Sequence, residues 1–285
     1  MRIHLVQMNV QVNDREANLK KILDYVDRGL SAEANLIVFG ECALVGYDFE
    51  AVNYKDLAEP IPGPATEKVA EMIAGRNCYV VFGMAESDGG FVYNSAPLIG
   101  PEGVVGAARK LYLANFKSAI TAKTYYEGVH FKPGQRIAVF DTLYGRIGIQ
   151  VCLDLYHPEI AQAQALAGAW LIVHPSATPI IKGGGRPPSV WETRPWENSV
   201  CWCYVNIVGG KTKNEFNGAT GVYLGTQGLQ VQASMGEEAG EEVVEYEVDS
   251  KTVLAAKQAF SPLRDVRPEL IKQLLTIAEK AQYGS

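Results

Sequence analysis

The chain of 285 residues contains a strand–helix–strand pattern twice, and this repetition limits the folds open to it more than any other feature. In the first unit, residues 3–8 alternate apolar and polar side chains as a strand does, and apolar positions then recur at helical spacing over residues 19–30. Asn13, with a glutamate three residues later, is the expected cap of this helix. The continuous apolar run 36–39 predicts a strand buried on both faces, and Glu41 follows it closely.

The second unit has the same outline. Residues 146–151 predict a strand that ends at Cys152, and Pro158 opens a helical pattern that Gly168 ends. The apolar run 171–173 then supplies the next strand. We therefore expect two similar halves, each with a polar side chain at the end of a strand.

Further predicted elements alternate between helix and strand along the rest of the chain. They are helices at 66–74, 250–257 and 268–281, and strands at 79–85, 92–99, 137–141, 201–208, 218–224 and 243–248. No low-complexity linker divides the chain, and the Pro- and Gly-rich stretch 182–188 is short enough to be a surface loop. The sequence thus predicts one α/β domain over residues 1–285.

Composition and charge exclude several classes of partner. With 26 Lys and Arg against 32 Asp and Glu, the net charge is -6, and no basic run suits nucleic acid or an anionic membrane. No apolar stretch reaches the roughly 18 residues of a membrane span, and the N-terminal segment turns polar too early for a signal peptide. The five cysteines have no disulfide-framework spacing, so we expect a cytoplasmic protein with reduced thiols.

Four polar residues could carry chemistry, and two of them stand at strand ends, where catalytic groups collect in α/β proteins. Glu41 and Cys152 each follow a predicted strand, and a turn after Cys152 would aim backbone N–H groups at a reacting oxygen. Lys110 lies between two apolar segments, and Glu127 precedes the turn at 131–134. Taken singly, each is explained as well or better as a loop carboxylate, an inert buried cysteine or a lysine with a buried stem.

Several common catalytic motifs are absent from the sequence. There is no Gly-x-Ser-x-Gly for a serine hydrolase, no Gly-x-Gly-x-x-Gly that opens a helix after a strand, and no phosphate loop. A cysteine–histidine protease would need a histidine beside the thiol, which the sequence does not reveal. No residue set has metal-ligand spacing, and Cys201-Trp202-Cys203 is better explained by alternation in an apolar strand.

Taken together, these residues resemble the carbon–nitrogen hydrolase (nitrilase) superfamily over nearly the whole chain. The motifs that carry the resemblance are Phe39-Gly40-Glu41 with Gly46-Tyr47, Arg109-Lys110-Leu111-Tyr112-Leu113, Glu127 before Phe131-Lys132-Pro133-Gly134, Gly148-Ile149-Gln150-Val151-Cys152-Leu153-Asp154 with Pro158-Glu159, Trp196-Glu197-Asn198, Val205-Asn206-Ile207-Val208-Gly209, and Pro262-Leu263-Arg264-Asp265 with Arg267-Pro268. The resemblance implies a four-layer αββα sandwich with two pseudo-symmetric halves, no cofactor or metal, and assembly into dimers or larger oligomers. We expect the C-terminal tail, about residues 260–285, to take part in those contacts.

The resemblance also implies a Glu–Lys–Cys triad. It corresponds here to Glu41 as the base, Lys110 as the electrostatic stabiliser and Cys152 as the nucleophile, and a second family glutamate corresponds to Glu127. The implied reaction is hydrolysis of a small amide, ureido compound or nitrile through a thioester. The backbone N–H of Leu153 is the expected second donor to the oxyanion.

Two departures from the family pattern bear on the substrate. Gly40 stands where the family commonly has proline before the first glutamate. True nitrilases usually carry Trp-Glu after the cysteine, whereas Leu153-Asp154 here resembles the amidase and carbamoylase branches. We therefore favour a linear amide or N-carbamoyl substrate. A nitrilase, a glutamine-dependent ammonia donor and a catalytically silent scaffold on the same fold stay open as alternatives.

The substrate pocket is harder to predict than the triad. We expect Tyr47, Trp191 and Arg194 to line it, with His174 and Ala177 contributed by the segment 174–179. Simple packing explains each aromatic side chain at least as well. Arg194 is the most informative candidate, because a guanidinium can bind a substrate carboxylate through two parallel hydrogen bonds.

Overall fold

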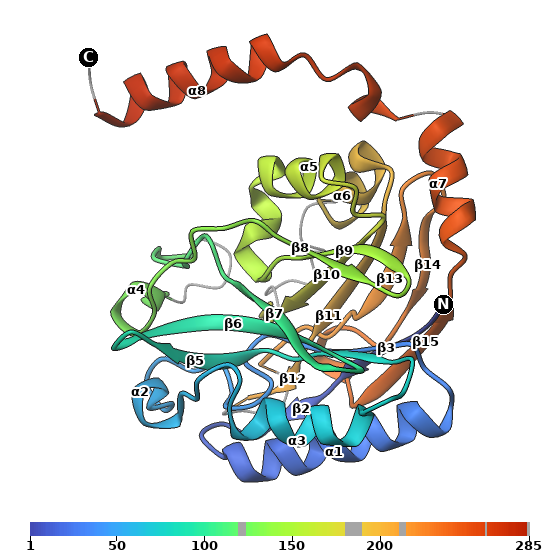
Figure 1. Cartoon of the computed structure of the whole chain (residues 1–285). Coiled ribbons are helices and arrows are strands. Elements are labelled where there is room, and N and C mark those ends of the chain that lie inside the picture. Colours follow the sequence, from blue (N-terminus) through green and yellow to red (C-terminus); the bar gives the residue numbers. More distant parts are fainter. Residues whose placement is uncertain (119–123, 180–189, 211–214, 260, 284–285) are drawn as a thin grey trace.

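Two β-sheets packed face to face form the centre of the protein, and helices cover the outer face of each sheet (Figure 1). The computed structural model describes residues 1–118, 124–179, 190–210, 215–259 and 261–283. The predicted loop at 182–188 lies outside these residues. The predicted four-layer αββα sandwich is confirmed.

The first sheet has seven strands in the order β15-β1-β3-β4-β6-β5, with β7 paired to β6. Its strands are β1 (Arg2–Gln7), β3 (Leu36–Phe39), β4 (Tyr79–Val81), β5 (Met84–Asp88), β6 (Phe91–Gly100), β7 (Gly103–Arg109) and β15 (Glu242–Glu247). Helices α1 (Arg15–Ser31) and α3 (Pro64–Ile73) pack their apolar sides on its outer face. The short helices α2 (Tyr54–Leu57) and α4 (Glu127–His130) lie toward one end.

The second sheet has six strands in the order β14-β13-β11-β10-β9-β8. Its strands are β8 (Ala138–Thr142), β9 (Gly145–Ile149), β10 (Leu171–Ser176), β11 (Cys201–Asn206), β13 (Gly221–Leu224) and β14 (Gly228–Gln232). Helices α5 (Pro158–Leu166) and α6 (Val190–Asn198) cover its outer face. The short strands β2 (Asn9–Val10) and β12 (Val208–Gly209) pair in parallel, so residues near the ends of β1 and β11 are also joined.

The repeated unit of the sequence is the repeated unit of the fold. β1, α1 and β3 form one parallel strand–helix–strand unit, and β9, α5 and β10 form the other. The apolar runs of both units meet between the sheets, where Leu5, Val38, Ile149 and Val173 belong to one buried cluster. This burial on both faces explains why β3 and the first half of β10, residues 171–173, are continuously apolar rather than alternating.

Some local predictions need correction. The cap of α1 is Asp14, which accepts a hydrogen bond from the Ala17 backbone N–H at 3.0 Å, and not Asn13, which has φ 64°. The predicted strand at 79–85 is divided into β4 and β5 around Gly83. A Cβ at Gly83 would lie 2.2 Å from the Cys42 backbone nitrogen, so a side chain there would displace the loop that carries Glu41.

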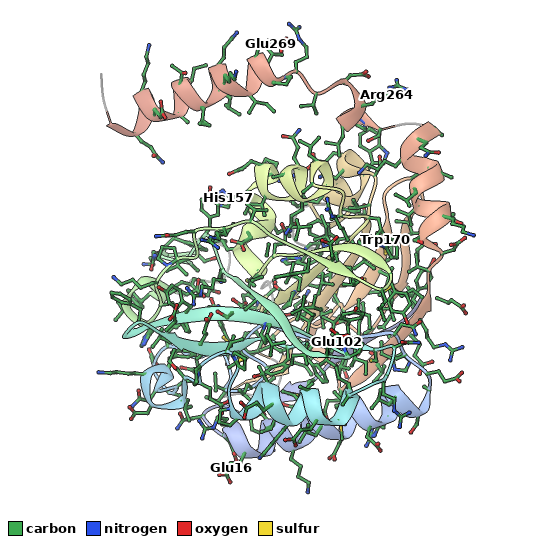
Figure 2. All side chains as sticks on the ribbon, viewed as in Figure 1. Glu16, Glu102, His157, Trp170, Arg264 and Glu269 are labelled. Carbon is green, nitrogen blue, oxygen red and sulfur yellow. The ribbon has the colours of Figure 1, made fainter. Side chains whose placement is uncertain are left out.

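The C-terminal helices α7 (Ser250–Ala259) and α8 (Pro268–Tyr283) leave the sandwich one after the other. α8 extends away from both sheets, and Figure 2 shows Glu269 at its start, far from the core. Several large apolar side chains on this helix are exposed: Leu270, Ile271, Leu274, Leu275 and Ile277. Across the described ranges, no helix combines the length and apolarity that crossing a membrane requires.

Candidate active site

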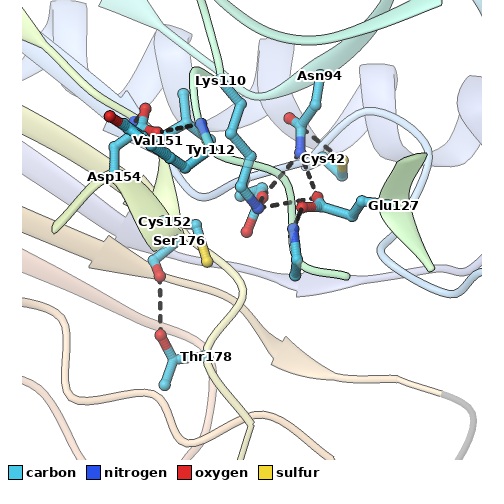
Figure 3. Close-up of polar contacts among 12 residues, drawn as sticks. Cys42, Asn94, Lys110, Tyr112, Glu127, Val151, Cys152, Asp154, Ser176 and Thr178 are labelled. Atoms are coloured by element: carbon cyan, nitrogen blue, oxygen red, sulfur yellow. Dashed lines mark hydrogen bonds and ion pairs between the residues drawn. The ribbon is translucent and has the colours of Figure 1, made fainter. Parts of the chain in front are cut away.

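The residues predicted to form a triad come together at one end of the sandwich (Figure 3). Glu41 follows β3, Lys110 follows β7 directly, and Cys152 begins a 3₁₀ turn, η1 (Cys152–Tyr156), just after β9. The Glu41 backbone N–H donates to the carbonyl of Ser176 at the end of β10, at 3.2 Å. This bond ties the first sheet to the second beside the cysteine.

Lys110 lies between two carboxylates and is almost inaccessible to solvent. Its Nζ is 2.8 Å from Glu41 Oε1 and 2.8 Å from Glu127 Oε1, and all three side chains are fully buried. The other carboxylate oxygen of Glu127 accepts from the Ala114 backbone N–H, which holds this carboxylate in place. The face of the Tyr47 ring lies 5.5 Å from Nζ and closes one side of the group.

Burial and the neighbouring charges shift the pKa values of Lys110 and Glu41. Burial alone would lower the pKa of the Lys110 ammonium, but Cys152 and both carboxylates raise it well above its ordinary value. Burial also raises the pKa of Glu41, with Glu127 adding to this shift and Lys110 opposing it. A lysine that stays charged beside a carboxylate of raised pKa provides a fixed cation and a proton acceptor at one place.

Cys152 is held in a strained backbone conformation at the start of its turn. Its φ is 47°, a left-handed value unusual for a residue with a side chain, and its carbonyl oxygen lies 2.9 Å from His174 Nε2. Burial raises the pKa of the thiol to about 12, with Glu41 adding to the shift while Lys110 and Ser176 oppose it. The resting thiol is therefore neutral and needs a base to take its proton as it attacks.

The turn after Cys152 supplies backbone donors. Leu153 is near the start of η1, and the first N–H groups of a helical turn have no carbonyl partner within that turn. Lys110 is close enough to the sulfur for its charge to oppose the rise in the thiol pKa. The arrangement can stabilise negative charge on a substrate oxygen with one ammonium and one backbone N–H.

Two residues of this centre were not predicted from the sequence. Asn94 on β6 donates through Nδ2 to Glu41 Oε1 at 2.8 Å and to Glu127 Oε1 at 3.2 Å. Asp154, fully buried in η1, accepts from backbone N–H groups of Leu111, Tyr112 and Val151. A single asparagine within a predicted strand gives no signal of its direction, and the sequence does not show that the aspartate two positions after Cys152 is buried against the segment after Lys110.

His174 lies beneath the cysteine and not beside its sulfur. The ring is fully buried against Trp202 and Tyr204, and Nε2 donates to the Cys152 carbonyl oxygen, so the proton is assigned to Nε2. Burial lowers the pKa of His174 to about 4, and Lys110 lowers it further, while the bond to Cys152 opposes the shift. The neutral ring supports the strained turn.

Protonation of His174 should destabilise the fold in acid. Since its pKa is about 4 in the folded chain and 6.5 for an ordinary histidine, the unfolded chain binds more protons between these values. Stability contributed by the neutral ring is thus present above pH 6.5 and lost as the pH falls to 4, by about 3 kcal/mol. Urea unfolding across this window should show that the free energy of unfolding falls more steeply with decreasing pH for the wild type than for His174→Gln. Equal slopes would contradict the assignment.

A cavity of about 390 Å³ is lined by Tyr47, whose ring faces Lys110, while Glu41, Lys110 and Cys152 are not in its described lining. Two of the predicted pocket residues, Tyr47 and Ala177, line it. Its described lining is mostly aromatic and acidic: Tyr47, Asp48, Phe49, Glu50, Thr124, Tyr125, Tyr126, Ala177, Pro179, Glu215 and Phe216.

Three other predicted pocket residues are not in the described lining of this cavity. His174 is beneath Cys152, as described above, and Trp191 packs on the Tyr204 ring at 4.5 Å. The Arg194 guanidinium donates to the Leu155 carbonyl and to Glu197, both at 2.9 Å. These contacts direct Arg194 toward η1 and its own helix, so the structure does not bring it to the cavity wall with Tyr47.

The chemistry available here is that of a partly buried thiol with a base and a cation. Within the described ranges, no three His, Cys, Asp or Glu side chains are grouped so as to hold a metal ion. The groups present can form a covalent bond to an electrophilic carbon, move one proton and stabilise one oxyanion.

Comparison with solved structures identifies the fold. A carbon–nitrogen hydrolase from Helicobacter pylori G27 superposes with a TM-score of 0.82 at 21% identity, covering 96% of this chain and 98% of that one. An amidase variant from Nesterenkonia sp. AN1, solved with the product of Michael addition of acrylamide at its active-site cysteine, superposes with a TM-score of 0.77. It is 20% identical and covers 96% of this chain and 99% of its own. At these identities the likeness concerns the fold alone.

Sequence comparison goes further. A nitrilase of Pyrococcus abyssi is 30% identical over 269 residues, which are 93% of this chain and 95% of the relative. The omega-amidase NIT2 of Mus musculus is 31% identical over 194 residues, 67% of each chain. The pattern that defines the carbon–nitrogen hydrolases matches residues 2–258. Since that match spans most of the chain, this chain belongs to the carbon–nitrogen hydrolase family, whose members act on C–N bonds.

Proposed function

We propose that this protein hydrolyses a small linear amide or N-carbamoyl compound through a thioester on Cys152. The observation that carries the proposal is the position of Lys110, buried between Glu41 and Glu127 at 2.8 Å from each, next to the thiol. Removing an ammonium and two carboxylates from water costs free energy that their mutual attraction need not repay in full. A purely structural element would therefore gain little from this group. Its residue types suit nucleophilic attack on an amide.

The first half of the proposed reaction forms the thioester. Glu41 takes the thiol proton as the sulfur attacks the carbonyl carbon, which accords with a thiol that is neutral at rest. Lys110 Nζ and the Leu153 N–H stabilise the resulting oxyanion. The C–N bond then breaks, and the leaving amine takes the proton that Glu41 holds.

The second half hydrolyses the thioester. Glu41 removes a proton from water, whose oxygen attacks the same carbonyl carbon, and the C–S bond breaks. The sulfur regains the proton from Glu41, and the acid leaves. Glu127 keeps Lys110 charged and oriented throughout, since it binds the same Nζ as Glu41. Glu41, Lys110 and Cys152 shift one another's pKa values, so these three groups titrate as a set.

The choice of amide over nitrile rests on two points. Leu153-Asp154 stands after the cysteine where true nitrilases usually carry Trp-Glu. An omega-amidase and an amidase are among the relatives and similar structures, although a nitrilase is among them too. A nitrilase, and a silent scaffold on the same fold, are the alternatives that the test must distinguish.

Ammonia release from a panel of linear amides, N-carbamoyl compounds and nitriles tests the proposal. We expect turnover of an amide or carbamoyl compound and a fall of about 10²–10⁴-fold in kcat for Glu41→Gln, which loses the base but keeps the shape. Glu59→Gln is the matched control, because Glu59 is also buried but pairs with Arg15 and caps α3. Turnover of nitriles alone would favour the nitrilase. No turnover by a folded wild type would favour the scaffold.

Assembly into a homodimer or larger oligomer belongs to the same proposal. Leu274, Leu275 and Ile277 on α8 are 55–63% exposed, and an isolated helix of this length is only marginally stable in water. Exposed apolar faces of this kind are typical of contact surfaces. A second copy of the chain is the partner that we favour.

A further inference from the structure

Asp154 connects the two segments that carry the lysine and the cysteine. Its side chain is 1% exposed, and both carboxylate oxygens accept hydrogen bonds from backbone N–H groups (Figure 3). Oδ1 accepts from Tyr112 at 2.9 Å and from Leu111 at 3.1 Å, while Oδ2 accepts from Val151 at 3.0 Å. Leu111 and Tyr112 directly follow Lys110, and Val151 directly precedes Cys152.

These bonds join parts of the chain that no strand pairing holds together at this point. Lys110 continues from β7 of the first sheet, whereas Cys152 follows β9 of the second sheet. The distance between Nζ and the Leu153 N–H therefore depends on how the two sheets' ends are connected. Asp154 makes that connection through a single rigid group, two residues from the nucleophile.

We propose that Asp154 is a positioning residue, which holds Lys110 and the Cys152–Leu153 turn at the separation that one substrate oxygen requires. The inference rests on the proposed function, because it assigns Lys110 and the Leu153 N–H to a common oxyanion site. Asp154 itself touches no reacting atom. Its effect passes through the backbone of residues 111, 112 and 151.

The energetic cost of this carboxylate supports the role. Burial raises the pKa of Asp154 to about 7, against the opposing effect of the Val151 and Tyr112 N–H groups and of Lys110. A group that is costly to keep ionised would be replaced by a neutral one if it only filled space. An asparagine cannot substitute fully, since its NH₂ would face a backbone donor where Asp154 offers an acceptor.

A second contact between the same segments lies at the surface. The Tyr112 ring stacks on His157 with centroids 3.2 Å apart, and its hydroxyl donates to Glu159 at 3.0 Å. Tyr112 is 38% exposed, so water competes for the hydroxyl bond. Tyr112→Phe removes that bond and keeps the backbone N–H that Asp154 binds, which makes it a matched control.

The test compares Asp154→Asn with wild type and Tyr112→Phe in two assays below the melting temperature. For amide hydrolysis, we expect Asp154→Asn to lower kcat about 10–100-fold with KM changed less than about threefold, since misplacement by an ångström has effects of this order. For alkylation by iodoacetamide, mapped to Cys152 by mass spectrometry, we expect the pH profile to move to higher pH. The reason is that Lys110 opposes the rise of the thiol pKa and would be less well placed. Tyr112→Phe should match wild type in both.

Each outcome decides the matter. A wild-type kcat and alkylation profile in Asp154→Asn, with only a lower melting temperature, would show a structural role and overturn the inference. A shifted alkylation profile in a protein that hydrolyses no amide would retain the positioning role and reject the proposed function. If Asp154→Asn does not fold, Asp154→Glu moves the carboxylate by one methylene, and the same pattern is expected in weaker form. A wild-type kcat and alkylation profile in Asp154→Glu would also overturn the inference.

Discussion

Replacement of Cys152 by alanine should abolish amide hydrolysis, with a fall in kcat of about 10⁴-fold or more, because it removes the thiol that forms the proposed thioester. The fold should be retained. Cys152 is only partly buried, and alanine meets the same left-handed φ of 47° as cysteine does. Lys110 keeps both carboxylate partners in the variant. Ammonia release and the mass of the protein after incubation with substrate measure the loss of turnover and of acylation.

Cys78→Ala is the matched control. Cys78 is also a free cysteine, but it is fully buried behind β4, where its sulfur donates to the Tyr79 carbonyl. This variant should lose some stability through the cavity that it leaves and keep wild-type kcat. Activity of Cys152→Ala within about tenfold of wild type would exclude the thioester mechanism.

The positions of the candidate catalytic residues Glu41 and Cys152 were predictable because the strands before them are strongly marked in the sequence. The apolar run 36–39 and the predicted strand 146–151 identify β3 and β9, and the ends of these strands locate Glu41 and Cys152. The family motifs then supplied Lys110 and Glu127, which the structure brings to the same point. Strand periodicity alone would not have found Lys110. It follows β7, whose sequence of glycine, alanine and valine becomes a strand by pairing with β6.

The pocket was less predictable because it depends on side-chain direction. Arg194 lies in a helix that contains Pro195, where no clear apolar period indicates which face is buried. Its guanidinium turns to the Leu155 carbonyl, a contact between segments 39 residues apart that the sequence does not encode locally. The contacts of Asn94 and Asp154 were equally unpredictable, since their hydrogen-bond partners are far away in the sequence and are brought close only by the fold. Substrate binding by Trp191, Arg194 and His174 stays a prediction.

Replacement of Lys110 by methionine should damage both activity and stability, for different reasons. The oxyanion loses a donor, which typically costs about 2.7–4 kcal/mol in the transition state, and the thiol loses the cation that opposes its high pKa. In the folded protein, Glu41 and Glu127 lose the ammonium that separates them, so two buried carboxylates face each other. Removing one partner of a buried ion pair commonly destabilises the folded protein by about 3–5 kcal/mol. Kinetics and urea unfolding measure the two effects.

A second substitution separates these effects. Glu127→Gln in the Lys110→Met background removes one of the two uncompensated carboxylates and keeps an acceptor for the Ala114 N–H. We expect this double variant to recover part of the lost stability and none of the lost activity. Glu127→Gln alone should cost stability, since Lys110 then has one charged partner, so the coupling between the two substitutions is favourable. Simple additivity of the two losses in stability would mean that Glu127 and Lys110 do not act as a charge pair. Recovery of activity with stability would mean that Lys110 serves the fold, and that the oxyanion is stabilised by other groups.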